Sequence, residues 1–387
     1  MTMQPSNPRR IPALNYLRGL AMLGVIGIHT GAYSLSNPHV NLSLFALLEI
    51  VTRFCVPIFF FISAFGLFLN HNLKEDYSYL RFMSRRAQTV LWPYLAWSFM
   101  YMVHYTWFYG DRSIWSRDIL PNYFFFGFAS YQLYFLVILL WFYLLFPLWR
   151  RIIQAILNKP VVPLTALLIL QILFNYYSSY HFKIRFDSAL LNTWLDNRMS
   201  YLCLHYVFIF LLGAVCAARY QDFLAVLNRY RQSIGWFFAL TLAGMLAAYY
   251  HYVTAPGSGP ERAVNIVHQL SPIGVLYTLA ATLFVFDRFQ SPRLPRLARQ
   301  VFDALGTHSY VIFLVHPFIM HYLTVALGKA NLMMTFTATV AFFLITVAAS
   351  LTAAIILQKI LIPLPLLYRL LTGSLPKTRQ PLKPAGQ

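Results

Sequence analysis

Two polar side chains share one face of the first apolar segment of the sequence. The stretch from Asn15 to Thr30 reads NYLRGLAMLGVIGIHT and contains Arg18 and, eleven positions later, His29. A helix would place these two side chains within about 20° of each other around its axis and about 16 Å apart along it. Side chains this far apart cannot form one catalytic pair, so each needs a separate task.

The two residue types suit different parts of a chemical reaction. Histidine titrates near pH 7 and can act as a general base. Arginine stays charged, and burying it in a bilayer costs at least a few kcal/mol, so Arg18 either reaches the lipid headgroups or meets a partner in a cavity. His29 alone could be a neutral interior group. Because Gly24, Gly27 and Gly31 form a small-residue strip on the opposite side, the pair favours a functional cavity beside closely packed helices.

Membrane-spanning helices are the elements expected to position these residues. Of the 387 residues, 59% are hydrophobic and only 11% are charged, whereas a soluble domain carries roughly a quarter charged residues. Apolar segments of about 20 residues, enough to cross a bilayer, recur between short polar breaks. The sequence predicts an all-α integral membrane protein, a bundle of about ten transmembrane helices at residues 11–33, 43–70, 87–109, 129–149, 161–180, 200–218, 233–253, 270–287, 305–327 and 332–358.

The distribution of charge predicts how the bundle is oriented. With the N-terminus in the cytoplasm, 21 of the 30 Lys and Arg residues fall inside, seven outside and two within the membrane. This is the asymmetry of the positive-inside rule, so both termini are expected in the cytoplasm and the net charge of +19 is expected to meet anionic membrane lipid. No basic patch is combined with a soluble aromatic platform, so no nucleic-acid partner is expected. We expect a transmembrane domain over residues 1–360 and a cytoplasmic tail over 361–387, in the cytoplasmic (inner) membrane.

The motifs of metal sites and bound cofactors do not occur in the sequence. The eleven histidines include no H-E-x-x-H, and neither C-x-x-C nor a glycine-rich phosphate loop is present. Cys55, Cys203 and Cys216 lie in apolar segments and are odd in number, which indicates small buried side chains and no disulfide framework. We therefore predict no metal and no bound cofactor.

The spacing of Arg18 and His29 resembles the Arg/Lys-x10-His motif of the membrane-bound acyltransferase-3 family, which contains O-acetyltransferases of bacterial surface polysaccharides. Further landmarks of that family have counterparts here in the same order, so the resemblance covers nearly the whole chain. The counterparts are RFCVPIFFFISAFGLFL from Arg53, RRAQTVLWPY from Arg85, YQLYFLVILLWFYLLFP from Tyr131 and HSYVIFLVHPF from His308.

Four positions depart from the family pattern. Ala64 replaces a usual glycine, and Thr89 stands where the family has the second arginine of the loop before the third span. Gln132 and Tyr134 replace the usual histidine and tryptophan. These departures raise the alternative that donor binding differs and that the chain represents a distinct subgroup, and they make Tyr134 a candidate for substrate binding.

The resemblance implies transfer of an acyl group, commonly acetyl, from cytoplasmic acyl-CoA as cosubstrate to a hydroxyl of a cell-surface glycan or its precursor. Such a reaction needs a base for the hydroxyl proton, a site for the developing oxyanion and a cleft for the anionic donor. On the predicted topology Arg18 lies in the inner half of the membrane and would meet the polar arm or phosphates of the donor. His29 lies in the outer half and would meet the thioester and the acceptor.

Arg53 and Glu49 have two interpretations. They are four residues apart, which is the spacing of an ion pair within a helix, so the pair could be structural. Alternatively, Arg53 faces the cavity and binds substrate while Glu49 orients His29. The sequence leaves both interpretations open.

The remaining candidates also have structural alternatives. Arg85 and Arg86 could bind the CoA phosphates, with Arg86 favoured by the resemblance, or could only set topology. His316 and Ser309 could form a second polar wall of the substrate site, although a histidine before Pro317 could instead cap a break in a helix.

An exporter or small-molecule transporter is the alternative function. Ten spans with buried ionisable groups also describe many carriers. The scarcity of intramembrane carboxylates, with Glu49 the clear case, counts against a proton-coupled carrier. Ser63 does not lie in a G-x-S-x-G nucleophile elbow, which disfavours it as a nucleophile.

Overall fold

The computed structural model describes residues 11–69, 73 and 75–376, and every regular element in those ranges is helical. This confirms the predicted all-α class. The longer helices are α1 (Pro12–Ser34), α3 (Cys55–Leu69), α5 (Trp92–Tyr109), α7 (Tyr134–Leu144), α8 (Phe146–Ile156), α9 (Val161–Tyr176), α12 (Val207–Ala218), α13 (Tyr220–Arg229), α14 (Arg231–Val253), α16 (Pro272–Gln290), α17 (Arg296–Lys329) and α18 (Phe336–Ile360). Shorter elements used below are α2 (Leu42–Phe45), η1 (Ala46–Ile50), α4 (Tyr79–Arg86), η2 (Ala87–Leu91), η4 (Tyr177–His181), η5 (Cys203–Tyr206), α15 (Pro260–Ile266) and α19 (Pro365–Thr372).

Among the described residues, six helices are long and apolar enough to cross a membrane, and up to eight if two bent pairs each count as one span. One pair is α7 and α8, which meet at 66°, and the other is η5–α12 and α13, which meet at 103°. A single straight helix over 129–149 is therefore not observed. Pro147 in the first turn of α8 has no backbone N–H to donate to the preceding turn, which favours the bend at Leu145. The count of ten spans and the cytoplasmic termini remain predictions.

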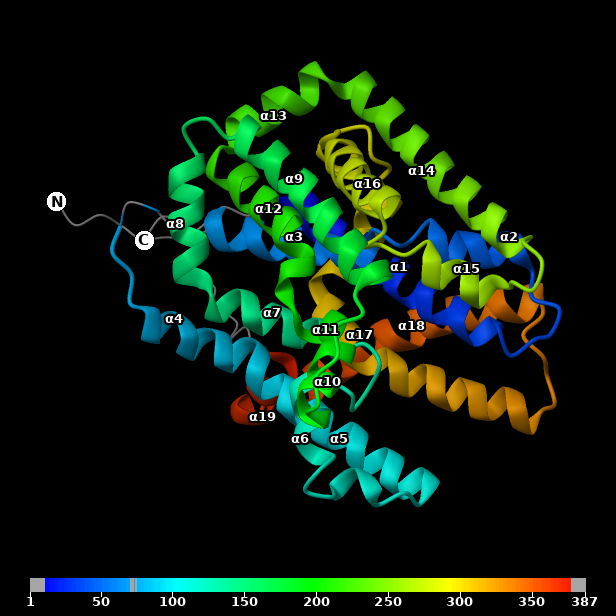
Figure 1. The fold of residues 1–387 in the computed structure, drawn as a ribbon. Helices are drawn as coiled ribbons and strands as arrows, with labels where there is room; N and C mark the ends of the chain where they lie inside the picture. The colour runs from blue at the N-terminus through cyan, green and yellow to red at the C-terminus, as the bar shows by residue number, and fades with distance from the viewer. Residues whose placement is uncertain (1–10, 70–72, 74, 377–387) are drawn as a thin grey trace, which may run out of the picture.

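Helix α1 lies inside the bundle and packs against α3, α16, α17 and α18 (Figure 1). The glycine strip on α1 permits close approach of η1 and α3, as predicted. A Cβ at Gly24 would collide with the Cys55 side chain, and a Cβ at Gly31 would lie 2.6 Å from Cγ of Glu49. The opposite face of α1, which carries Arg18 and His29, is thereby directed toward α7 and α17.

Adding a methyl group at Gly24 is therefore expected to destabilise the bundle. Overpacking of a tight core typically costs about 1–3 kcal/mol, so Gly24→Ala should lower the temperature of thermal unfolding in detergent. Gly235→Ala is the matched control, because a Cβ at Gly235 in α14 meets nothing within 4 Å. Replacing Cys55 with alanine should recover part of the loss at Gly24. An unchanged unfolding temperature in Gly24→Ala would contradict the close packing of α1 and α3.

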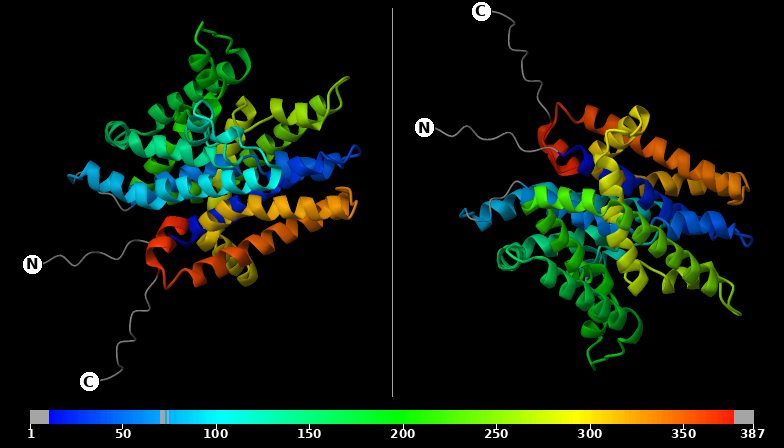
Figure 2. Two further views of the ribbon diagram at one scale, coloured as in Figure 1. Left: turned by 90° about the horizontal axis from the view of Figure 1, so that it is seen from below. Right: turned by 90° about the horizontal axis from the view of Figure 1, so that it is seen from above.

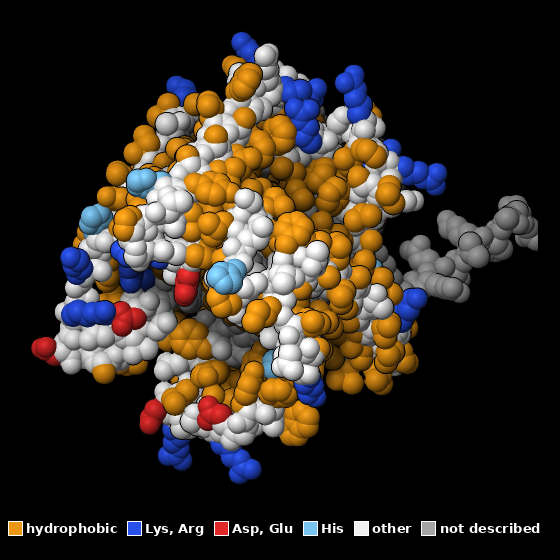
Figure 3. Space-filling view, turned by 90° about the vertical axis from the view of Figure 1, so that its right-hand side faces the viewer, with side chains coloured by type: hydrophobic (Ala, Val, Ile, Leu, Met, Phe, Trp, Pro, Cys, Tyr) orange, Lys and Arg blue, Asp and Glu red, His pale blue; other side chains and the backbone are white. Residues whose placement is uncertain are grey.

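The first residues of α1, the end of α16, the start of α17 and helix α19 lie at one end of the bundle (Figure 2). Tyr16 of α1 packs edge-on against Phe289 of α16, and Phe289 contacts Phe302 of α17. The opposite end carries α2 and α15. Seen from that end, hydrophobic side chains cover much of the surface, and most of the Lys and Arg side chains stand toward its margins (Figure 3).

Part of the expected tail belongs to the folded bundle. Helix α19 packs against α5, and the indole Nε1 of Trp97 donates a hydrogen bond to the carbonyl of Leu371 at 3.0 Å. Gly373 follows α19 with φ +66° and lies against the carbonyl of Thr89. Residues 377–387 of the expected tail lie outside the described residues.

Candidate active site

Arg18 lines an internal cavity of about 160 Å³ between α1, α3, α7 and α17. The cavity wall also includes Ser63 of α3, together with Ser309 and Tyr310 of α17. No acidic side chain lines this cavity, and no hydrogen-bond acceptor is recorded for the Arg18 guanidinium among the described residues. Arg18 is thus a cation that faces a largely apolar cavity and has no counterion among the described residues. A buried cation of this kind requires an anionic or strongly polar partner.

His29 lines a second cavity, of about 60 Å³, further along the same face of α1. Its ring lies 4.2 Å from the ring of Tyr131 and 5.5 Å from the ring of His316, measured between ring centres. The two histidine rings are nearly parallel, at 22°. Neither nitrogen of His29 has a hydrogen-bond partner in the part of the chain that the structure describes, so a bound molecule could meet this ring directly.

The protonation state of His316 can be inferred from its surroundings. Its Nδ1 lies 3.1 Å from the carbonyl oxygen of Ile312, and a carbonyl only accepts, so Nδ1 carries the proton in the neutral ring. Nε2 is buried without a partner and is left with its lone pair. Helix α17 continues through Pro317, so His316 does not cap a break in it. The site therefore contains two neighbouring imidazole rings, and at least one presents a free basic nitrogen.

Three phenylalanines separate the two cavities. Phe59, Phe135 and Phe313 come from α3, α7 and α17, and each lines both cavities. Phe135 contacts the other two rings, with centres 5.8 and 5.6 Å away. Arg18 and His29 thus lie on either side of an aromatic constriction, consistent with the separation along α1 that the sequence predicts. A narrow apolar chain with a polar head at one end would fit this arrangement.

Arg53 and Glu49 form an ion pair and also contribute to the His29 cavity. Nη2 of Arg53 lies 2.7 Å from Oε2 of Glu49, and both side chains are largely buried. Arg53 lines the cavity with His29, and its Nε is buried without an acceptor. No hydrogen bond or ion pair joins Glu49 to His29 among the described residues, so Glu49 holds Arg53 rather than His29. Arg53 is thus both paired within its own segment and part of the cavity wall, and substrate binding by Arg53 remains a prediction.

Gln132 and Tyr134, two of the departures from the family pattern, both line the His29 cavity. Gln132 is buried, and its Nε2 lies 3.5 Å from the hydroxyl of Tyr101. Its Oε1 has no hydrogen-bond partner within the described part of the chain. These two departures therefore lie in the wall of the His29 cavity.

Arg86 and its neighbour Arg85 differ in environment. The guanidinium of Arg86 lies 5.2 Å from the ring centre of Phe82 and 5.3 Å from that of Tyr143, and its Nε is buried without an acceptor. The Tyr143 hydroxyl lies 3.1 Å from Oγ of Ser63, which lines the Arg18 cavity. Arg85 is exposed. Of the two arginines, Arg86 is the one that contacts Tyr143, whose hydroxyl is bonded to a residue of the Arg18 cavity wall.

Thr89 does not replace the function of the arginine expected at its position. Its hydroxyl donates to the backbone carbonyl of Arg85 at 3.0 Å, inside the π-helical turn η2. A different arginine lies nearby, because Arg369 of α19 donates to the side-chain carbonyl of Gln88. Sequence analysis missed Arg369, because it falls in the segment that was expected to be a tail.

Sequence analysis also missed the ring of Tyr131 and the three phenylalanines of the constriction. Tyr131 is the first residue of the segment YQLYFLVILLWFYLLFP. Its position next to Gln132 was the only feature of the sequence that pointed to the site. Phe59, Phe135 and Phe313 cannot be distinguished in the sequence from the chain's other apolar residues. Within the described ranges, no group of three or more His, Cys, Asp or Glu side chains is arranged to hold a metal ion.

Comparison with protein families gives one match. The model of the acyltransferase-3 family, described as an acyltransferase domain, matches residues 11–357. No curated protein and no solved structure matches the chain. The matched range contains both cavities and every candidate residue predicted from the sequence.

Proposed function

Since this chain belongs to the acyltransferase-3 family, we propose that it transfers an acyl group, in the simplest case acetyl, from cytoplasmic acyl-CoA to a hydroxyl of a cell-surface glycan or its precursor. The proposed location is the inner membrane. The observation that carries the proposal is an unpaired arginine and an unpaired histidine on one face of α1, on either side of an aromatic constriction. The charge of Arg18 suits the polar arm or phosphates of the donor, and the constriction suits its slender thiol-bearing chain.

In the proposed mechanism His29 removes the proton from the acceptor hydroxyl. The acceptor oxygen then attacks the thioester carbonyl, and the new C–O bond gives a tetrahedral intermediate with a negative oxygen. The Arg53 guanidinium, held by Glu49 at the edge of the cavity, stabilises that oxygen. Collapse breaks the C–S bond, and protonated His29 returns its proton to the departing thiolate. His316 supplies a second basic nitrogen beside the first ring.

Arg86 is proposed to bind a phosphate of the donor on its way to Arg18. Arg86→Ala is expected to raise the apparent KM for acetyl-CoA about ten-fold, since a charged hydrogen bond contributes roughly 1.5–3 kcal/mol. Arg85→Ala is the matched control, because it removes the same charge from the same helix at an exposed position. Steady-state kinetics of the purified protein measure both values. Equal increases of KM in the two variants would indicate that Arg86 only helps to set the membrane topology.

The direct test of function compares the surface glycans of cells with and without the protein. Loss of the protein should lower the acetyl content of the glycan and leave the amount of polymer unchanged. An exporter would give the reverse, less polymer with the same acetylation. Transfer of labelled acetyl groups by the purified protein to glycans from the deleted strain would then identify the acceptor.

A further inference from the structure

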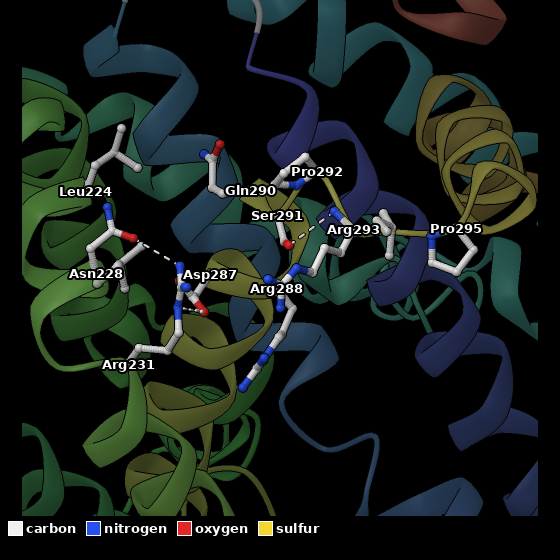
Figure 4. Close-up of a pocket in the computed structure, with 12 residues that line it drawn as sticks. Leu224, Asn228, Arg231, Asp287, Arg288, Gln290, Ser291, Pro292, Arg293 and Pro295 are labelled. Atoms are coloured by element: carbon white, nitrogen blue, oxygen red, sulfur yellow. Dashed lines mark hydrogen bonds and ion pairs between the residues drawn. The ribbon is translucent and has the colours of Figure 1, made fainter.

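A larger cavity opens at the end of the bundle where α13, α14, α16 and α17 meet (Figure 4). Its volume is about 690 Å³, and it shares no lining residue with the Arg18 or His29 cavity. Its walls come from the end of α13, the first residue of α14, the end of α16 and the connection 291–295. On the predicted topology this end of the bundle faces the cytoplasm.

The cavity carries excess positive charge. Arg231 is paired with Asp287, with Nη2 3.0 Å from Oδ1, and Asp287 is the only acidic residue in the lining. Arg288 and Arg293 also line the cavity, and no acceptor is recorded for either guanidinium among the described residues. Arg288 lies over the ring of Phe284 at 4.9 Å, which restricts it without neutralising it. Figure 4 shows the Arg231–Asp287 pair on the α13 side, with Arg288 and Arg293 beside it. Two positive charges therefore remain available to a ligand.

A groove with one apolar wall continues from this cavity along the first turns of α14. The groove has a volume of about 670 Å³ and shares Asn228, Arg231 and Arg288 with the cavity. Arg229 and Gln232 complete its polar side. Its other walls include Gly235, Trp236 and Ala239 on successive turns of α14, and Trp236 is 64% exposed. Helix α14 is one of those apolar enough to cross a membrane, and tryptophan is typical of the boundary between headgroups and hydrocarbon. The pocket thus has a cationic part at the end of the bundle and an apolar part along a membrane-facing helix.

We propose that this site binds an anionic phospholipid. The phosphate lies between Arg288 and Arg293, and one acyl chain follows the groove at Gly235 and Trp236. A soluble anion would bind the arginines but leave the groove empty. A neutral lipid would occupy the groove but would not neutralise the charges of Arg288 and Arg293. Basic pockets between helices at the cytoplasmic side are suited to lipid phosphate. A bound lipid would join α14 to the connection between α16 and α17, independently of the transfer reaction.

The test measures binding of a fluorescent phosphatidylglycerol to the full-length protein in neutral detergent micelles. Each basic residue near a membrane surface contributes about five-fold to affinity for anionic lipid, so the double variant R288Q/R293Q should bind roughly twenty-five-fold more weakly. R296Q/R299Q is the matched control, because it removes two exposed charges from the same end of the bundle outside the cavity. The lipid affinity of this control should stay within about two-fold of that of the unmodified protein. Equal losses in both double variants would overturn the proposed cavity site.

A second variant tests the groove with every charge intact. A Cβ at Gly235 meets no atom within 4 Å, and Gly235 lines the groove. Gly235→Leu should therefore fold and project its side chain into the groove. It is expected to weaken lipid binding at least ten-fold. Inorganic phosphate and CoA are added as competitors, and neither should displace the lipid at millimolar concentration. Displacement by either one, or unchanged binding in Gly235→Leu, would overturn the lipid assignment in favour of a soluble anion.

Discussion

Replacing His29 with alanine is expected to lower the rate of acyl transfer by about 10²–10⁴-fold, the usual contribution of a positioned general base. The ring of His29 lies 4.2 Å from that of Tyr131 and faces the cavity where Arg53 would stabilise the oxyanion. The base acts only after the donor is bound, so the Kd for acetyl-CoA should stay within about two-fold. Single-turnover transfer of labelled acetyl groups by the purified protein measures the rate, and equilibrium binding measures the Kd.

Two further histidine variants of α17 make this test specific. His308→Ala is the matched control, because the Nδ1 of His308 bonds Gln358 at 2.6 Å and the residue lines neither cavity. It should transfer acyl groups at nearly the normal rate. If His316→Ala loses the full rate while His29→Ala keeps it, the base is His316. If both histidine variants keep the normal rate, general-base catalysis in this cavity is wrong, and the polar face of α1 is better interpreted as the lining of a transport path.

The common face of Arg18 and His29 could be predicted from the sequence because it depends only on helical geometry. Once residues 12–34 form one helix, an offset of eleven positions fixes both the direction and the separation of the two side chains. The glycine strip was predictable for the same reason. The Glu49–Arg53 pair also follows from local spacing, although it forms across the end of a π-helical turn.

The partners of α1 across the cavity could not be predicted from local patterns. His316 is 287 positions from His29, and its place opposite that ring depends on how α17 packs against α1. That register is set by contacts such as the one between Gly306 and the carbonyl of Asn15. Such contacts join residues far apart in the chain, and nothing in the local sequence marks those residues as partners. The resemblance to a family indicated that His316 belongs to the site. The pattern of apolar residues alone could not have indicated this.

Arg369 shows a different limit of sequence analysis. Its helix α19 has only eight residues, follows the last apolar segment and lies close to a proline-containing terminus, so composition alone suggests a tail. The helix is held by tertiary contacts, including the hydrogen bond from Trp97 to Leu371. Short helices depend on such contacts more than on their own propensity, so they are the least predictable elements.

Removing the guanidinium of Arg18 is expected to weaken donor binding about 100-fold and to leave the rate at saturating donor largely unchanged. The planar guanidinium of arginine can donate two hydrogen bonds to a phosphate or amide oxygen, and the compact ammonium of lysine cannot reproduce this geometry. Arg18→Gln should therefore lose most of the affinity, and Arg18→Lys should still lose at least ten-fold. Isothermal titration with CoA and with acetyl-CoA measures both variants in purified protein.

The effect of Arg18→Gln on stability distinguishes donor binding from a structural role. A charge that faces a cavity without a counterion costs free energy in the empty protein, so its removal should leave the temperature of unfolding unchanged or raise it. Saturating CoA should stabilise the unmodified protein far more than the variant, because a ligand stabilises the state that binds it. An arginine that served as a structural anchor would behave in the opposite way, and its loss would lower the unfolding temperature without donor. Normal CoA affinity in a folded Arg18→Gln protein would remove Arg18 from the donor site, and the unpaired charge in the cavity would then have to serve a ligand other than the donor.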